Sequence, residues 1–102
     1  MAALNNSNAE LEMSAISLSE IAMMSAIGKL DLSEEDVRTG MSDLRIRMLS
    51  YTAGHASHLF SLPLHHTDPF DRQIIAQALA EKIPVVTSDD KFRLYRGIRV
   101  IW

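Results

Sequence analysis

The sequence predicts a single α/β domain built on a mostly parallel sheet that is flanked by helices. First, short apolar stretches typical of strands alternate along the chain with stretches that carry helix-start signals. Second, a chain of 102 residues, of which 47% are apolar and 23% charged, has the size and composition of one globular domain. Third, the chain has no cysteine, which excludes a disulfide framework and a zinc–thiolate site. Strands that alternate with helices favour parallel pairing through crossover connections.

The first half of the chain is predicted to contain a disordered polar start, two strands and three helices. Both strands have apolar residues at alternate positions. Ser17 or Ser19 caps the first helix, which ends at Gly28. Ser33 begins the second helix, because the three acids after it interact favourably with the helix dipole, and Thr52 caps the third. The expected ranges are 1–9 for the start, 11–16 and 44–48 for the strands, and 17–27, 33–41 and 52–60 for the helices.

The second half begins with the sharpest helix signal in the sequence. Asp68 is a good N-cap, Pro69 suits the first helical position, and Asp71 stands in the first turn. An apolar stripe continues this helix through residue 80, and Pro84 stops it. Short strands are predicted over 84–87 and 98–101, with a short helix over 89–95 between them.

Three acids follow strand ends or begin a helix, and this topology brings them toward one edge of the sheet. Glu20 comes after the strand at 11–16, Asp89 after the strand at 84–87, and Asp71 can point the same way, with Asp68 and Asp90 nearby. Clustered carboxylates suit Mg²⁺ or Mn²⁺, which can activate water for attack on a phosphodiester. A purely structural interpretation also stands, because first-turn acids stabilise helices by about 0.3–1 kcal/mol each.

The four histidines offer a different metal site. His55 and His58 lie three residues apart on one predicted helix face, and His65 and His66 precede the Asp68 turn. Imidazole and carboxylate groups together could bind Zn²⁺ in an unrelated α/β metal-binding domain. The usual ligand spacings are absent, however, and adjacent histidines in an extended segment point apart. We therefore expect loop or supporting positions for them.

Charge is distributed unevenly along the chain. The net charge of −3 excludes a generally basic nucleic-acid-binding protein, and the region up to residue 36 holds seven acids against one base. Residues 91–102 hold four bases and no acid, which indicates either an anionic partner or a solvated basic edge. No stretch predicts a signal peptide or a membrane span, and the lack of cysteine fits a cytoplasmic protein. The four bases are Lys91, Arg93, Arg96 and Arg99.

Several of these segments together resemble a known family. The pieces are the Leu62-Pro63 link, His65-His66-Thr67-Asp68-Pro69-Phe70-Asp71-Arg72, Ala76-Gln77-Ala78, Val86-Thr87-Ser88-Asp89, Tyr95 before the last strand, and, upstream, residues 14–22 and 28–30. Through them, residues 10–102 resemble PIN-domain proteins, and within that family the VapC-like toxins of type II toxin–antitoxin systems.

The resemblance implies a Rossmann-like fold and an endoribonuclease that depends on Mg²⁺ or Mn²⁺. Glu20, Asp71 and Asp89 match three members of the family's acidic quartet, and Asp68 belongs to the subgroup's own motif. Thr87 is expected to order the loop before Asp89. Lys91, Arg93 and Arg96 would bind the RNA backbone. The implied partners are a cognate antitoxin protein and a second copy of the chain.

One departure from the family pattern concerns the start of the chain. The family begins with a central strand that carries Leu-Asp-Thr, and here no aspartate occurs before Asp31. We therefore expect the first strand and its ligand to be missing, through a start site placed too far downstream or a truncated copy. We expect a gap at the centre of the sheet and weaker metal binding, because affinity depends on ligand charge. The alternative function is a catalytically inactive PIN domain that acts as a protein-interaction module.

Overall fold

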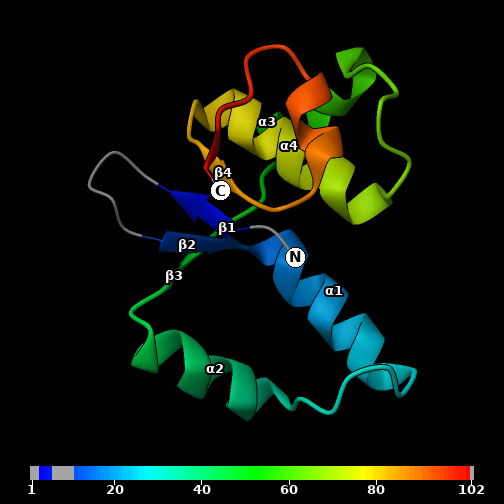
Figure 1. The fold of residues 1–102 in the computed structure, drawn as a ribbon. Helices are drawn as coiled ribbons and strands as arrows, with labels where there is room; N and C mark the ends of the chain where they lie inside the picture. Colours follow the sequence, from blue (N-terminus) through cyan, green and yellow to red (C-terminus); the bar gives the residue numbers. More distant parts are fainter. Residues whose placement is uncertain (1–2, 6–10, 102) are drawn as a thin grey trace.

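The computed structural model describes residues 3–5 and 11–101, and in this part five strands form one mixed sheet. The strand order is β3-β2-β1-β4-β5 (Figure 1). β2 pairs in parallel with β3, and β4 with β5, whereas β1 is antiparallel to both β2 and β4. Four strands thus share one direction, and the α/β class is confirmed. The predicted mostly parallel sheet needs correction, because β1 makes two of the four strand pairings antiparallel. The strands are β1 (Ala3–Asn5), β2 (Leu11–Ser14), β3 (Arg47–Leu49), β4 (Val85–Val86) and β5 (Val100–Ile101).

The central position of the sheet is occupied, which differs from the expected gap. Leu4 of β1 pairs with Glu12 on one side and with Val85 on the other, and its side chain is fully buried. The three residues of β1 thus bridge the inner edges of β2 and β4, and Leu4 fills the core between them. Residues 3–5 belong to the start that was predicted to be disordered, and they form a strand. Residues 1–2 and 6–9 of that start lie outside the described part.

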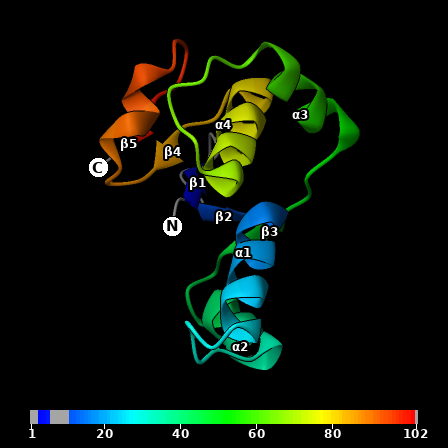
Figure 2. The ribbon, with the colours of Figure 1, turned by 90° about the vertical axis from the view of Figure 1, so that its right-hand side faces the viewer.

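Helices cover the sheet and extend beyond it. Figures 1 and 2 show α2 at one end of the molecule and α3 and α4 at the other. In residues 3–5 and 11–101, no helix has the length and apolar character needed to cross a membrane. The helices are α1 (Ala15–Ala26), α2 (Glu34–Asp43), α3 (Ala53–Ser57) and α4 (Pro69–Glu81), with the 3₁₀ helices η1 (His58–Ser61) and η2 (Asp90–Leu94).

Two helix predictions need correction. α1 begins before either predicted cap, because the Ser14 Oγ accepts a hydrogen bond from the Ile16 N–H at 3.0 Å. Ser17 therefore lies inside the helix, where it is fully buried. The helix predicted over 52–60 is capped by Thr52 as expected, but it is divided into α3 and η1.

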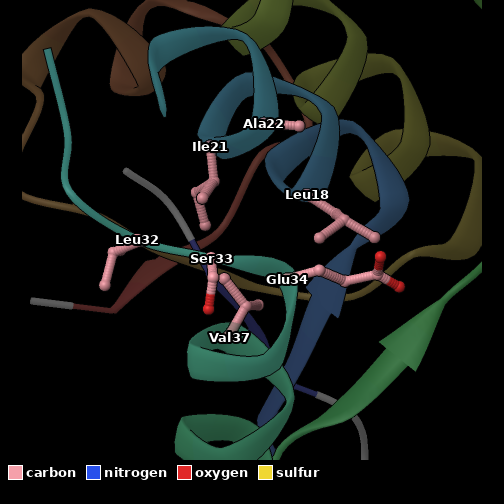
Figure 3. Close-up of a pocket in the computed structure, with 7 residues that line it drawn as sticks. All are labelled: Leu18, Ile21, Ala22, Leu32, Ser33, Glu34 and Val37. Atoms are coloured by element: carbon pink, nitrogen blue, oxygen red, sulfur yellow. The ribbon is translucent and has the colours of Figure 1, made fainter. Parts of the chain in front are cut away.

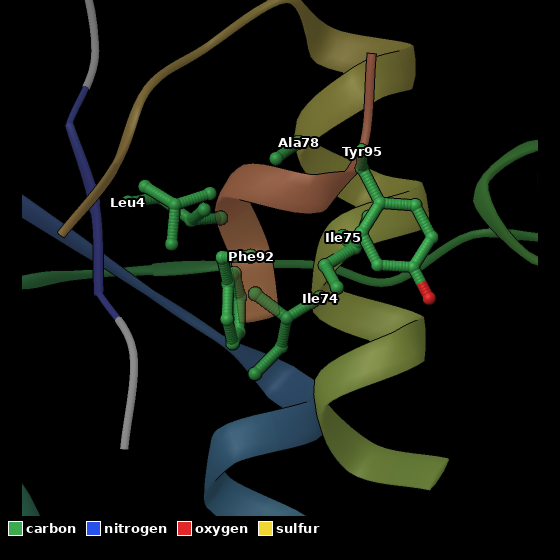
Figure 4. Packing of buried hydrophobic residues seen from close by; sticks show 7 residues of the cluster. Leu4, Ile74, Ile75, Ala78, Phe92 and Tyr95 are labelled. Atoms are coloured by element: carbon green, nitrogen blue, oxygen red, sulfur yellow. The ribbon is translucent and has the colours of Figure 1, made fainter. Parts of the chain in front are cut away.

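The core forms where α4 and the C-terminal segments meet β1. Figure 4 shows side chains from α4, from β1 and from the η2 region directed toward one another. α4 begins as predicted, since the Asp68 carboxylate accepts hydrogen bonds from the N–H groups of Phe70 and Asp71, at 2.9 and 3.1 Å. The cap and the packing of α4 in the core together fix the first turn of α4 and the position of Asp71 within it. The buried cluster is Leu4, Ile74, Ile75, Ala78, Val85, Phe92 and Tyr95.

Candidate metal centre

Two of the predicted acids meet around a buried histidine. The Nε2 atom of His66 lies 2.9 Å from Oδ2 of Asp89 and 3.0 Å from Oδ2 of Asp71. Asp71 stands in the first turn of α4, Asp89 follows β4, and His66 lies in the link that leads into α4. One ligand atom from each residue lies within 4.8 Å of the other two, and the described part of the chain contains no other such group of three. These atoms form a compact set of metal-ligand types.

His66 is held in one orientation by its surroundings. Its Nδ1 accepts a hydrogen bond from the Asp68 N–H at 3.2 Å, and its own backbone N–H donates to the Tyr95 hydroxyl at 2.9 Å. The ring meets Phe92 edge-on, with centroids 5.9 Å apart, and only 6% of the residue is exposed. Because Nδ1 is an acceptor, the proton of the neutral ring is on Nε2, which donates to Asp89.

Asp89 is held by the loop that precedes η2. Its backbone N–H donates to Thr87 Oγ1 at 3.1 Å, and its Oδ1 accepts from the Lys91 N–H at 2.9 Å. The first contact agrees with the expected role of Thr87 in ordering this loop. The Lys91 N–H bond, assisted by the hydrogen bond from His66, holds the pKa of Asp89 below its usual range. Asp89 is therefore ionised at neutral pH.

Asp71 and Glu20 have the opposite electrostatic environment. Burial raises the pKa of Asp71, and the charges of Asp68 and Asp89 add to this effect while His66 opposes it. Burial also raises the pKa of Glu20 on α1, and the charges of Asp68 and Asp71 raise it further. Glu20 therefore lies within electrostatic reach of Asp68 and Asp71. Crowded carboxylates that resist ionisation are stabilised by a cation, so this donor set fits a hard divalent metal.

The remaining predicted site residues surround this cluster. Asp68 is the N-cap of α4, as expected, and its charge acts on both Asp71 and Glu20. Lys91 and Arg93 lie on η2, directly after Asp89, and Arg96 follows two residues beyond the end of that helix. All three bases are exposed, and the Lys91 charge lowers the pKa of Asp89. Positive side chains therefore follow the carboxylates along the chain.

The comparisons with known proteins agree with this geometry. The model of the PIN domain matches residues 1–98 of the chain. The chain belongs to the PIN-domain family. PIN domains are metal-dependent nucleases that generally use divalent metals and act on nucleic acids. A search of curated proteins gave no significant match.

His66 is the residue of this PIN domain that sequence reasoning did not place among the site residues. Adjacent histidines were expected to point apart, and they do, since His66 is buried and His65 is exposed. Burial of His66 beside two carboxylates was not expected. The spacing between His66 and Asp68 could have indicated this position. A histidine two residues before an N-cap can accept a hydrogen bond from the backbone N–H of the capping residue.

The alternative zinc site, with His55 and His58 on one helix face, is not found in the described residues. His55 is buried, and its Nε2 lies 2.6 Å from Oε1 of Glu81, near the end of α4. Its Nδ1 accepts the Thr52 N–H at 3.0 Å, so the ring belongs to the cap of α3. His58 and His65 are exposed and join no described group of three ligands.

An apolar pocket of the PIN domain is lined by none of the residues of the metal-ligand cluster. Figure 3 shows it between α1 and the start of α2, with a volume of about 330 Å³. Its wall is mostly aliphatic and contains none of the clustered acids, so it is not the chemical centre. The lining residues are Leu18, Ile21, Ala22, Leu32, Ser33, Glu34 and Val37.

Proposed function

We propose that this PIN domain is a metal-dependent endoribonuclease of the VapC toxin type. Asp71, Asp89 and Glu20 would hold Mg²⁺ or Mn²⁺, and Asp68 would add negative charge beside them. The supporting observation is the convergence of Asp71 and Asp89 on the Nε2 atom of His66, from two separate elements. Carboxylate oxygens are the ligands that such hard cations prefer.

The residues of the chain have distinct tasks in this proposal. Asp89 is ionised and ready to bind a cation, whereas the pKa values of Asp71 and Glu20 are raised and would be lowered by a bound cation. A bound divalent metal supplies a water of lowered pKa and positive charge beside the phosphate. Lys91, Arg93 and Arg96 would contact backbone phosphates, and such contacts bind RNA without reading its sequence.

The VapC assignment is more specific than membership of the PIN-domain family. It is supported by the resemblance of residues 62–72 and 86–89 to that group, within a chain that belongs to the PIN-domain family. The partners would be an RNA substrate, a cognate antitoxin protein and a second copy of the chain, in the cytoplasm. A nucleic-acid substrate is the partner class that family membership itself implies.

A catalytically inactive PIN domain that serves as an interaction module is the second candidate function. The central strand β1 provides the observation that favours it. Ala3 pairs with Val86, so β1 begins at the edge where β2 and β4 end, and it runs away from that edge. The described part of this central strand is Ala3-Leu4-Asn5, which has no carboxylate in either direction, and the reduced ligand charge would weaken metal binding.

Cleavage of mixed RNA in the presence of Mn²⁺ distinguishes the two functions. We expect the wild-type chain to cleave, and Asp71→Asn to lower the rate by roughly 100-fold or more, since removing even a supporting residue of a metal site costs about 10–100-fold. Asp43→Asn is the matched control, because this exposed carboxyl lies at the end of α2.

Two results would contradict the enzyme assignment. If folded wild-type protein leaves RNA intact with Mn²⁺, the inactive interaction module is the better description. In that case Asp71→Asn should still bind any partner protein as the wild type does. If Asp71→Asn cleaves as fast as Asp43→Asn, the carboxylate cluster is not the catalytic centre.

A further inference from the structure

We propose that His66 is a positioning residue that holds Asp71 and Asp89 together through its Nε2–H, and that it is not itself a metal ligand. This inference rests on the metal site in the proposed function. It goes beyond that site by giving His66 a role different from that of the acids around it. The alternative is that His66 supplies the third ligand atom, since its Nε2 lies with the two carboxylates.

The tautomer of His66 decides between the two roles. The backbone N–H of Asp68 points at Nδ1, so Nδ1 must offer its lone pair. The neutral ring then carries its proton on Nε2, the atom that faces both carboxylates. A metal ligand needs a free lone pair at that position. To ligate, the ring would have to move its proton to Nδ1 and lose the bond from Asp68, which would leave that N–H without its partner.

The surroundings of His66 stabilise this arrangement. The backbone N–H of His66 donates to the Tyr95 hydroxyl, and the Arg72 guanidinium contacts the same hydroxyl at 3.4 Å and the carbonyl of His66 at 3.5 Å. Phe92 covers one edge of the ring. Backbone and ring are thus fixed from separate directions, which is the condition for a side chain that orients others.

The two carboxylates need such a link because they repel each other. Like charges at this short range repel each other, and the two residues belong to different elements of the chain. The His66 Nε2–H donates to Oδ2 of Asp89 and lies 3.0 Å from Oδ2 of Asp71. Both oxygens are therefore gathered around one positive hydrogen, which fixes the separation of two groups that would otherwise move apart.

The chain contains the same arrangement a second time, away from the acids. His55 accepts the Thr52 N–H at Nδ1 and meets the Glu81 carboxylate at Nε2, and it is as buried as His66. There the arrangement joins α3 to the end of α4, with only one carboxylate. His55 is therefore a matched control. Its substitution measures what a buried histidine with these hydrogen bonds contributes to stability, without any effect on the metal site.

The first test follows the ring nitrogens directly. Long-range ¹H–¹⁵N correlation spectra of protein with ¹⁵N-labelled histidine report the tautomer of each ring, and loss of one signal in His66→Gln assigns it. We expect His66 to keep a protonated Nε2 before and after saturation with Mg²⁺. Loss of that proton, or a change to the Nδ1–H tautomer on addition of Mg²⁺, would overturn the proposal.

The second test compares Mn²⁺ affinity by calorimetry with thermal stability. His66→Ala should weaken Mn²⁺ binding by about 10–100-fold, as loss of an orienting partner does. His66→Gln should restore most of the affinity, because its amide N–H₂ can reach the position of Nε2. His55→Ala should lower Tm and leave the affinity unchanged. Unchanged affinity in His66→Ala, or no rescue by His66→Gln, would contradict a positioning role.

These measurements separate this inference from the function on which it rests. Absence of RNA cleavage, with Mn²⁺ affinity and the tautomer as expected, would contradict the nuclease assignment alone. A changed tautomer in a protein that cleaves RNA would contradict the positioning role alone. Absence of Mn²⁺ binding by folded wild-type protein would overturn both.

Discussion

The side chain of Asp71 is 19% exposed, and its carboxyl group lies 3.0 Å from Nε2 of His66 and close to other acids. Burial and the Asp68 charge raise its pKa, so folding favours its protonated form. The protonated Asp71 carboxyl therefore contributes to the free energy of unfolding. This contribution is complete below the pKa of Asp in the unfolded chain, near 4, and is lost as the pH rises through the higher pKa of the folded state. Glu20 behaves in the same way, and Asp89, whose pKa is lowered, has the opposite sign.

Replacing Asp71 with asparagine should therefore stabilise the metal-free protein. At pH 7 we expect Asp71→Asn to have a higher Tm than the wild type without metal, because the neutral amide removes a buried charge. Mn²⁺ should raise the Tm of the wild type and leave that of Asp71→Asn nearly unchanged. Calorimetry at pH 7 and below pH 4 measures both effects. The difference in Tm between metal-free Asp71→Asn and metal-free wild type should shrink at the lower pH. A lower Tm for metal-free Asp71→Asn at pH 7 would contradict this account.

At the scale of elements, the start of α4 contributes both to the stability of the helix and to the geometry of the candidate metal site. Asp68 caps the helix with Oδ1, and its backbone N–H orients His66. Its negative charge also raises the pKa of both Asp71 and Glu20. The cap contributes to the free energy of unfolding, whereas the charge acts on the neighbouring carboxyls, so one side chain has two separable effects.

Two substitutions at position 68 separate the cap from the charge. Asp68→Ala should lower the free energy of unfolding by about 1 kcal/mol, because the N–H groups of Phe70 and Asp71 lose their acceptor. Asp68→Ser should lower the free energy of unfolding by only roughly a few tenths of a kcal/mol, since serine is an equally good cap. Both variants should bring the pKa of Asp71 closer to its usual range. Urea denaturation and ¹³C titration of the carboxyls measure these effects, and equal destabilisation by Ala and Ser would show that the charge dominates.

At the scale of the whole molecule, β1 closes the sheet. Without it, β2 and β4 would each expose an unpaired edge, and the core would lose the side chain between them. Leu4 has no exposed surface and belongs to the same cluster as Ile74 and Phe92, so three residues link the two halves of the sheet. Figure 4 shows Leu4 facing these side chains.

Truncation of Leu4 should therefore be costly. We expect Leu4→Ala to lower the free energy of unfolding by about 2–5 kcal/mol, because it leaves a cavity in a packed core. Leu4→Met should cost less than about 1.5 kcal/mol, since it nearly conserves volume. Leu64→Ala is the control, because Leu64 is 73% exposed and its loss should stay within about 0.5 kcal/mol. Equal urea midpoints for Leu4→Ala and Leu64→Ala would show that β1 does not close the core.

Features that depend on neighbouring residues in the chain could be predicted, and those that depend on distant ones could not. The caps at Ser33, Thr52 and Asp68 were all expected, because each involves a hydrogen bond within three residues. The start of α1 was misplaced because several nearby serines offer equivalent caps. The strand at residues 3–5 had no local pattern, since its pairing comes from residues up to 83 positions away.

The sequence by itself determined the α/β class, the capped start of α4 and the presence of acids after the strands, because these follow from periodicity and local hydrogen bonding. Only the tertiary structure decided that β1 fills the centre of the sheet in the antiparallel direction, and that His66 lies between Asp71 and Asp89. Both depend on contacts between segments far apart in the chain. Burial of the apolar Leu4 side chain stabilises one set of contacts, and hydrogen bonds to the buried His66 stabilise the other, with partners that no local pattern identifies.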